Sequence, residues 1–425
     1  MKFQTLKRLG QAVALMFFML IFAGNAMATD VAEGTVLSKA NLAELENQTF
    51  QGIKIGDLLT DSQKMWIKDY DLKMKLSKTT ELKLDPAYLA ATKKNAGLAK
   101  FDTGTKAVSN YKAGIPFPKV DENDPDAGYK LAWNNYYANP VMGDNWIATG
   151  DVSIVEAEKG RVDRFEAKSA KMIMEGRTTG DASIGNKGDH ARYLLVISKP
   201  YDLAGLGIFT KQYSTGKSDD AWAYVKSIRR TRRIAGGKSW MDPQPKMDLL
   251  NDDNQAMNAY PLWYQGWKLI GKRWILGIVT GHKTDNKPHF EDNVEQAFPY
   301  WNPTNVNWEP REVYVIEAIP PKEHPYSKKV LYMDAKYPFF YQSDLYDRKG
   351  EFWRMWRQTY FATTAKNGQP GLSFNSTQAI DFQRNRATYI DIINTNLNNP
   401  EFTDKAFSPK MLQQAGSGGL DKFLK

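Results

Sequence analysis

The stretch 311–361 decides the fold of this chain. It contains four runs rich in Val, Ile, Tyr, Phe and Trp: REVYVIEAIP (311–320), SKKVLYMDAK (327–336), YPFFYQSDLYD (337–347) and EFWRMWRQTYF (351–361). Turn or charge signals separate the runs, a pattern typical of consecutive antiparallel strands. The break Asp347-Arg348-Lys349-Gly350 supplies the glycine that a short hairpin loop needs. We therefore predict an antiparallel meander over 311–361.

Both faces of the last predicted strand carry large apolar side chains. One face has Trp353, Met355 and Phe361, and the other has Phe352, Trp356 and Tyr360. A sheet with one wet face would alternate between apolar and polar residues. We therefore expect this strand to be covered on both sides, by a helix on one side and by a cavity for an apolar ligand on the other. A sandwich core with an aromatic girdle is the alternative, and residue spacing does not choose between the two.

Residues 1–28 have the features of a secretory signal peptide. A positive segment, an apolar run and a small-residue cleavage site follow one another as Lys2, Lys7 and Arg8, Ala12–Gly24, and Ala26-Met27-Ala28. We expect cleavage before Thr29 and a periplasmic location. An uncleaved membrane anchor is the alternative, but this apolar run is short for a membrane span. No later stretch reaches the roughly 18 apolar residues that a span needs.

The amino-acid composition excludes cysteine chemistry and indicates the charge of a partner. The chain has no cysteine, which excludes disulfides, thiol catalysis and a lipid attached through an N-terminal cysteine. The net charge is +9, and residues 1–28 contribute three of these positive charges, so the mature chain keeps +6. This surplus suits an anionic surface such as lipid head groups. Nucleic acid is not expected as a partner of an exported protein.

The rest of the chain divides into three expected parts. They are a mixed helical and loop extension over 29–144, a β-rich unit over 145–362, and a helical C-terminal tail over 363–425. Asp85-Pro86 is an N-cap followed by proline at the first helical position, which predicts a helix that runs to about Leu98. In the tail, the aliphatic residues have helical spacing over Thr377–Asn394, at Ile380, Ala387, Ile390 and Ile393.

The polar residues predict neither a catalytic site nor a metal site. The closest histidines stand in an irregular polar loop with nearby acids: His282, His289, Asp285, Glu291 and Asp292. A solvated loop is favoured there over a metal site. The Asp/Asn-rich stretch 248–254 lacks the spacing of a calcium loop and predicts a capped polar turn. TGKS (215–218) lacks the glycine of a phosphate loop, and no G-x-S-x-G is present, so we expect a protein that is not an enzyme and has no cofactor.

The densest basic cluster consists of Arg229, Arg230, Arg232 and Arg233. On a strand, Arg229 and Arg233 would share one face, and Arg230 and Arg232 the other. Arginine suits bidentate contacts to phosphate or carboxylate, so these residues are candidates for binding an anionic partner. A set of salt bridges with neighbouring acids is the alternative.

Three blocks of sequence are together similar to a known family. They are ATKKNAGLAK (91–100) with GIPFP (114–118) and Trp133-Asn134; DDAWAYVKSIRRTRRIAGG (219–237) with DLLNDDNQ (248–255); and WKLIGKR (267–273) with HPYSKKVLYMDAKYPFFYQSDLYDRKGEFWRMW (324–356). In this order they resemble the bacterial secreted family catalogued as domain of unknown function 1329. The resemblance covers most of the chain after residue 28.

The resemblance implies an α+β fold similar to the lipoprotein-sorting proteins LolA and LolB. In those proteins helices close the mouth of a half-open antiparallel β-barrel whose cavity holds acyl chains. The resemblance also implies a cavity for a hydrophobic, lipid-like ligand, and as partners an outer-membrane barrel protein and a resistance-nodulation-division transporter. It leaves the N-terminal extension unexplained. We expect apolar strand residues to line this cavity, namely Leu269, Trp274, Leu331, Trp353 and Met355.

The leading interpretation is a non-enzymatic periplasmic carrier or adaptor for a hydrophobic molecule that works in envelope trafficking. Apolar residues on both faces of the strands, without a catalytic constellation, favour it. The alternative is an accessory protein of an outer-membrane barrel or transporter that holds no ligand. Its contact surface would be the N-terminal extension with Gly114–Pro118.

Overall fold

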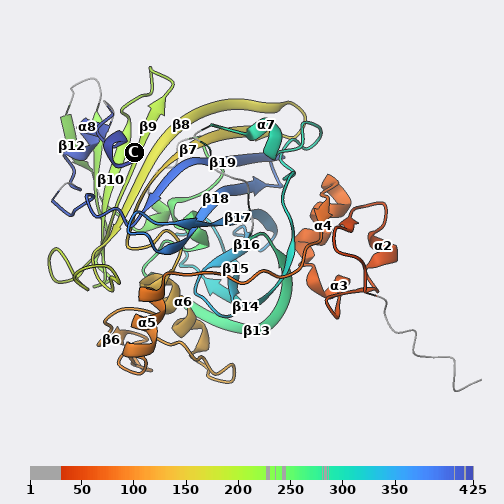
Figure 1. The fold of residues 1–425 in the computed structure, drawn as a ribbon, viewed down its shortest axis with the longest axis horizontal. Coiled ribbons are helices and arrows are strands. Elements are labelled where there is room, and N and C mark those ends of the chain that lie inside the picture. Colours follow the sequence, from red (N-terminus) through yellow and green to blue (C-terminus); the bar gives the residue numbers. More distant parts are fainter. Residues whose placement is uncertain are drawn as a thin grey trace, which may run out of the picture.

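The computed structural model describes residues 30–424 except 226–229, 235, 242–245, 280, 282–284, 286, 406 and 416–417. The predicted signal peptide, Arg229 and His282 lie outside the described residues. The described chain forms one large antiparallel sheet, three two-stranded ribbons in the N-terminal part, and short helices around the sheet (Figure 1). Its described helices include none that is long and apolar enough to span a membrane.

Thirteen strands form the large sheet, in the order β12-β11-β10-β9-β8-β7-β19-β18-β17-β16-β15-β14-β13 (Figure 1). Their bounds are β7 (Asn145–Glu156), β8 (Gly160–Ile173), β9 (Asp189–Lys199), β10 (Gly207–Tyr213), β11 (Asp220–Val225), β12 (Arg230–Ile234), β13 (Gly266–Gly277), β14 (Glu309–Ile319), β15 (Lys328–Asp334), β16 (Phe340–Tyr346), β17 (Phe352–Thr364), β18 (Pro370–Asp381) and β19 (Arg386–Leu397). The meander predicted over 311–361 is confirmed as β14 to β17.

The sheet consists of two meanders that meet in its middle. β7 to β12 run outward to one edge, and β13 to β19 start at the opposite edge and return until β19 pairs with β7. The strand order has two ends, so the sheet is open, as predicted for a half-open barrel. Since β12 and β13 lie at opposite edges, the chain between them must cross the sheet.

We call residues 246–265 the crossing segment. It contains η3 (Asn251–Ala256) and η4 (Pro261–Trp263), and η2 (Ser239–Met241) precedes it. Its apolar residues pack on one side of the sheet, which we call the cavity face. This face presents Val152 of β7, Ile390 of β19 and Trp356 of β17. α6 (Ala127–Ala138) packs on the same side, beside edge strand β13.

The opposite face is covered by the two ends of the described chain. The N-terminal module (residues 30–76) contains β1 (Val36–Leu37), α2 (Leu42–Leu45), β2 (Thr49–Phe50), β3 (Ile53–Lys54), α3 (Ile55–Leu58), α4 (Asp61–Tyr70) and β4 (Met74–Lys75). It packs on β13 and β17 to β19 through side chains that include Trp66 and Ile67. The C-terminal segment (residues 399–424) contains α8 (Met411–Ala415) and α9 (Asp421–Leu424) and packs on β7 to β10.

Local capping fixes the helices that touch the sheet. The Thr60 hydroxyl accepts a hydrogen bond from the N–H of Gln63, and the Gln63 side chain accepts one from the N–H of Thr60, which is a capping box at the start of α4. α5 (Pro86–Asn95) begins after Asp85, as predicted, because this side chain accepts from the N–H of Ala87. The ribbon β5 (Lys100–Phe101) and β6 (Val108–Ser109) follows α5, and α7 (Phe290–Asn293) lies between β13 and β14.

The helical tail predicted for 363–425 is wrong over its first half, because β18 and β19 stand there, in the middle of the sheet. The aliphatic residues that have helical spacing in the sequence do not share one face of the sheet. Ile380 and Ala387 pack against the N-terminal module, whereas Ile390 lines the cavity face. Central strands buried on both sides lose the alternation that identifies a strand. The β-rich unit therefore extends past 362 to Leu397.

Candidate ligand-binding cavity

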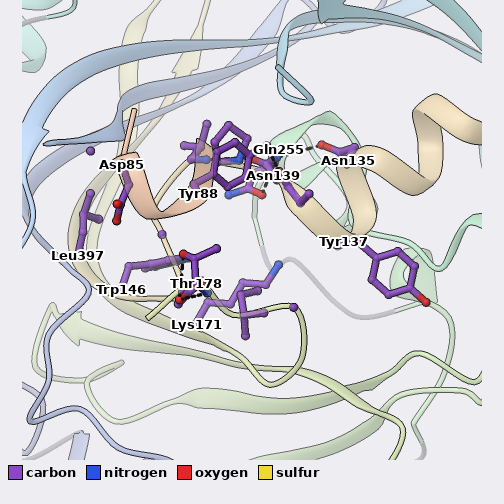
Figure 2. Close-up of a pocket in the computed structure, with 18 of the residues that line it drawn as sticks. Asp85, Tyr88, Asn135, Tyr137, Asn139, Trp146, Lys171, Thr178, Gln255 and Leu397 are labelled. Atoms are coloured by element: carbon purple, nitrogen blue, oxygen red, sulfur yellow. Dashed lines mark hydrogen bonds between the residues drawn. The ribbon is translucent and has the colours of Figure 1, made fainter. Parts of the chain in front are cut away.

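Two adjoining chambers lie between the cavity face and the segments that cover it. The apolar chamber has a volume of about 110 Å³, and the polar chamber, shown in Figure 2, has a volume of about 80 Å³. Both chambers are lined by Trp146, Lys171, Gln255 and Asn258. We call these residues the neck, since they separate the two environments.

The floor of the apolar chamber is made by the centre of the sheet. The strand register places Phe165 of β8 opposite Val152 of β7, and Val152 opposite Ile390 of β19. Alternate residues of each strand therefore present a continuous apolar surface on the cavity face. Met247 and Leu249 of the crossing segment line the same chamber. Such a lining suits the tail of an apolar ligand.

The polar chamber is built from the end of α6 and the start of β9. The Tyr136 ring stacks on His190 with 3.9 Å between the centroids, and Nδ1 of His190 lies 3.2 Å from Oε1 of Glu175. Burial lowers the pKa of His190, although Glu175 opposes this shift. We infer that His190 is neutral at pH 7 and acts as a packed polar wall.

Two carboxylates also line the polar chamber. Asp144 accepts hydrogen bonds from the backbone N–H and hydroxyl groups of Thr178 and Thr179. Asp85 accepts from the N–H of Ala87 at 2.8 Å through one oxygen, and its other oxygen is buried without a hydrogen-bond partner among the described residues. These side chains define an acidic side of the chamber.

Lys171 projects from β8 into the neck. The register places it opposite Trp146 on β7 and Tyr193 on β9, whose ring centroids lie 6.2 Å apart. Its side chain is half-buried, and within the part of the chain that the structure describes its Nζ has no hydrogen bond or ion pair. Burial lowers the pKa of Lys171 to about 8, and the carboxylate of Asp219 opposes this shift. The cavity thus contains an ammonium group to which no described residue brings a counter-ion within hydrogen-bond distance.

A buried cluster of charges fastens the crossing segment to the sheet. Nζ of Lys329 on β15 lies 3.0 Å from Oδ2 of Asp252 and 3.0 Å from Oδ1 of Asp253 in η3. The Tyr326 hydroxyl donates to Asp253, and Nε2 of His324 lies 3.2 Å from Oδ2 of Asp252. Burial would raise the pKa of Asp252, but Lys329 and His324 outweigh it and hold this pKa below its ordinary value. Because η3 leads into the neck, the cluster fixes the cover of the cavity.

The five residues predicted to line a cavity lie outside both chambers. Leu269 and Leu331 pack with α6 and the crossing segment, and Met355 packs against the N-terminal module. Trp353 is half-buried and donates a hydrogen bond from Nε1 to β18. Trp274 is 37% exposed on edge strand β13, where it borders a separate open groove. Ligand binding by these five residues stays a prediction.

Three residues of the predicted basic cluster lie on edge strand β12, and Arg229 lies outside the described residues. Arg230, Arg232 and Arg233 are exposed, and Arg233 forms an ion pair with Asp220 of β11. The salt-bridge alternative thus applies to one member, and binding of an anionic partner by the others stays a prediction. Exposed charges on an edge strand also discourage pairing with other chains.

The polar stretches that the sequence singled out have two different environments. His289 lies in an exposed loop with Nε2 2.7 Å from Oδ1 of Asp285 and Nδ1 3.3 Å from Oδ2 of Asp292. The stretch 248–254 contains the predicted capped turn, since Asp253 accepts from the N–H of Leu250. The sequence analysis missed that the same stretch carries the buried charge cluster.

The fold and site define an α+β protein whose open antiparallel sheet holds a cavity under its own crossing segment. The chain belongs to the family described as protein of unknown function DUF1329, whose profile matches residues 37–413. The resemblance drawn from the three sequence blocks is therefore confirmed. An uncharacterised protein of Pseudomonas aeruginosa is 26% identical over 314 residues, or 70% of this chain, and the chain spans 65% of that relative's length.

Three solved structures illustrate the range of structural similarity. A DUF1329 family protein from Desulfovibrio piger has 20% identity and a TM-score of 0.46, with 68% of this chain and 100% of that chain covered. An outer membrane lipoprotein-sorting protein domain from Vibrio parahaemolyticus has 16% identity and a TM-score of 0.46, covering 68% and 99%. A LolA superfamily protein from Nitrosomonas europaea has 13% identity and a TM-score of 0.37, covering 62% and 90%. These similarities are too distant to transfer a function.

Proposed function

We propose that this protein is a periplasmic carrier that binds a hydrophobic, lipid-like molecule in the cavity beneath the crossing segment and works in envelope trafficking. The observation that carries the proposal is the apolar chamber, whose sheet floor is continuous from β8 to β19 and whose cover includes Met247 and Leu249. A ligand with an apolar tail would bind there by leaving water.

The energetics favour a ligand with a long chain. Each methylene removed from water contributes about 0.8 kcal/mol, so ten buried methylenes contribute about 8 kcal/mol. Association costs at least about 4 kcal/mol of translational and rotational freedom. The chamber of about 110 Å³ is smaller than ten methylenes, so a long chain would bind usefully once the crossing segment moved aside and enlarged the chamber, whereas a short chain would not.

Loading would require the crossing segment to move away from the cavity face. Its start at Lys246 lies beside β8 and β19, its end leads into edge strand β13, and η3 is held by the charge cluster on β15. A change in the environment of the protein at a membrane or partner could shift this segment between covered and open positions. The carrier would then take up its ligand at one membrane and release it at the other.

The test is native mass spectrometry of the mature protein purified without detergent, followed by organic extraction. The carrier function predicts an added mass that extracts as a lipid or hydrocarbon, and displacement of a fluorescent fatty acid by the extract. Ala167→Phe should abolish both results, since Ala167 lines the apolar chamber. Val162→Phe on the same strand is the matched control, because Val162 is 45% exposed. A wild-type protein that carries nothing and takes up no probe would refute the proposal.

The accessory function without a ligand is supported less well. Residues 114–116 of its expected contact loop are buried, and a side chain at Gly114 would meet the backbone of Thr92 at 2.4 Å. An outer-membrane barrel protein or a transporter stays the proposed partner. Crosslinking in the envelope would test it. Capture of such a partner by an empty protein would favour the accessory function.

A further inference from the structure

The neck residue Lys171 points to the chemical class of the ligand. We propose that Lys171 binds the carboxylate head group of a single-chain amphiphile whose tail fills the apolar chamber. This inference rests on the proposed carrier function and adds the polarity and orientation of the ligand to it.

Lys171 lies where the apolar chamber meets the polar chamber, as the head group of an amphiphile lies where its apolar tail ends. Phe165, Ala167, Ser169 and Lys171 follow one another on the cavity face of β8, so the apolar floor ends at the ammonium group. The polar chamber begins on the other side of the same side chain. An amphiphile with its head at the neck would place its apolar and polar parts in matching surroundings.

Among the described residues, Lys171 has no partner at hydrogen-bond distance, and a bound carboxylate would supply one. Buried or partly buried charges in folded proteins are normally paired, because leaving water unpaired is costly. Trp146 and Tyr193 flank the side chain across both neighbouring strands, and the half-buried side chain has reduced contact with water. Figure 2 shows Lys171 below the centre of the view and Asp85 at its upper left. The free ammonium group is thus open to an anion that enters the chamber.

A second donor stands at the neck. The Gln255 side-chain oxygen accepts from Asn139 at 3.5 Å, while its amino group has no hydrogen-bond partner among the described residues. Gln255 has a φ of +56°, an uncommon conformation for a residue other than glycine. An ammonium group and an amide N–H₂ together can hold the two oxygens of one carboxylate.

The surrounding charges favour a carboxylate over a phosphate. Asp85 and Asp144 line the polar chamber, and Asp219 is close enough to affect the pKa of Lys171. These acids repel added negative charge, so the site suits a singly charged carboxylate better than a doubly charged phosphate. Phosphate groups are more often held by the fork of an arginine, and no arginine is among the residues that line either chamber in the described structure.

Direct binding to the delipidated full-length mature protein tests this proposal. The probes are hexadecanoate, hexadecanol and hexadecyl phosphate, each added from an organic stock below the concentration at which it aggregates, and the affinity of each is measured by displacement of a fluorescent apolar probe. We expect hexadecanoate to bind at least tenfold more tightly than hexadecanol. Lys171→Met should remove this preference and leave hexadecanol binding within twofold. Lys171→Arg should keep most of the preference, and Lys187→Met, at an exposed loop lysine, should change nothing.

The possible failures are distinguishable. If hexadecanol and hexadecanoate bind equally and Lys171→Met alters neither, the carrier function stands and the role of Lys171 is overturned. Tighter binding of hexadecyl phosphate than of hexadecanoate would overturn the carboxylate as head group. If no probe binds the wild-type protein, the carrier function falls and this inference falls with it. Thermal unfolding of each variant checks that the comparison uses folded protein.

Discussion

Nζ of Lys329 lies 3.0 Å from Oδ1 of Asp253, and their side chains are 1% and 0% exposed. This contact joins the middle of strand β15 to η3, which belongs to the cover of the cavity rather than to the sheet. Asp252 shares the same ammonium group at 3.0 Å. The position of the cover thus depends on charges that have left water completely, and such charges are stable only while they are paired.

Lys329→Met should therefore destabilise the protein strongly. Removal of the ammonium group leaves two buried carboxylates, and breaking a buried pair in this way costs about 3–5 kcal/mol of the free energy of unfolding. Urea unfolding measures it. Lys328→Met is the control, because Lys328 is 38% exposed and lies 3.8 Å from Glu317, so its loss should cost less than about 1 kcal/mol. Equal losses in the two variants would contradict a buried cluster.

Lys171→Met should stabilise the empty protein near neutral pH. The pKa of Lys171 is lowered to about 8 by burial, whereas an unfolded chain keeps lysine protonated up to about pH 10.4. The unfolded state therefore binds more protons between these values, and the wild-type free energy of unfolding rises with pH across this window. We expect a gain of about 1–3 kcal/mol for the variant at pH 7 that disappears by about pH 10.5. Denaturant titrations at several pH values would show it, and a constant difference at every pH would contradict it.

Asp344→Asn should change the dependence of stability on pH in acid. Burial raises the pKa of Asp344 to about 6, although hydrogen bonds from Ser62, Gln342 and Tyr332 oppose this shift. The folded state then binds more protons than the unfolded state between about pH 4 and pH 6, so the wild-type free energy of unfolding falls as pH rises through that window. Relative to the variant, the wild type should lose up to about 3 kcal/mol between pH 4 and pH 7. A parallel pH profile for the two proteins would argue against it.

Phe407→Ala should detach the C-terminal segment from the sheet. Phe407 is fully buried, with ring centroids 5.3 Å from Phe209 of β10 and 4.8 Å from Phe402. Truncation of a buried phenylalanine costs about 3–5 kcal/mol. Thermal unfolding and protease sensitivity of residues 399–424 measure the effect. Phe298→Ala, at a phenylalanine that is 45% exposed, should cost about 1 kcal/mol or less.

Local sequence patterns predicted the second meander but not its continuation. β14 to β17 are separated by clear turn signals, and their residues are strongly β-forming. β19 is also rich in β-forming residues, with RATYIDIINTNL, yet apolar residues on both faces of β18 and β19 produced a misleading helical spacing. What identifies β19 as a central strand is its pairing with β7, more than 200 residues earlier in the chain. No local pattern contains that information.

The sequence led us to predict a cavity for an apolar ligand, but it did not identify the residues that line the two chambers. Which face of each strand is covered, and by what, depends on the crossing segment, whose path follows from the strand order. Two local signals were nevertheless present. Lys329 alternates with Leu331 and Met333, and Lys171 ends the alternating series that begins at Phe165. A lysine on an otherwise apolar strand face indicates either a buried ion pair or a ligand. The described residues supply ion-pair partners for Lys329 and none for Lys171.

Each meander is covered by a segment from the other end of the chain, and this arrangement affects how the protein folds. The N-terminal module lies on the later meander, and the C-terminal segment lies on the earlier one. Neither half therefore carries its own outer layer, and a nascent chain that ends after β12 exposes Ile147, Ala170 and Leu194. Such a chain keeps this apolar surface in contact with water until the later residues cover it, which makes it prone to aggregation. We therefore expect the sheet to fold as one unit, and a truncated product without the C-terminal segment to aggregate.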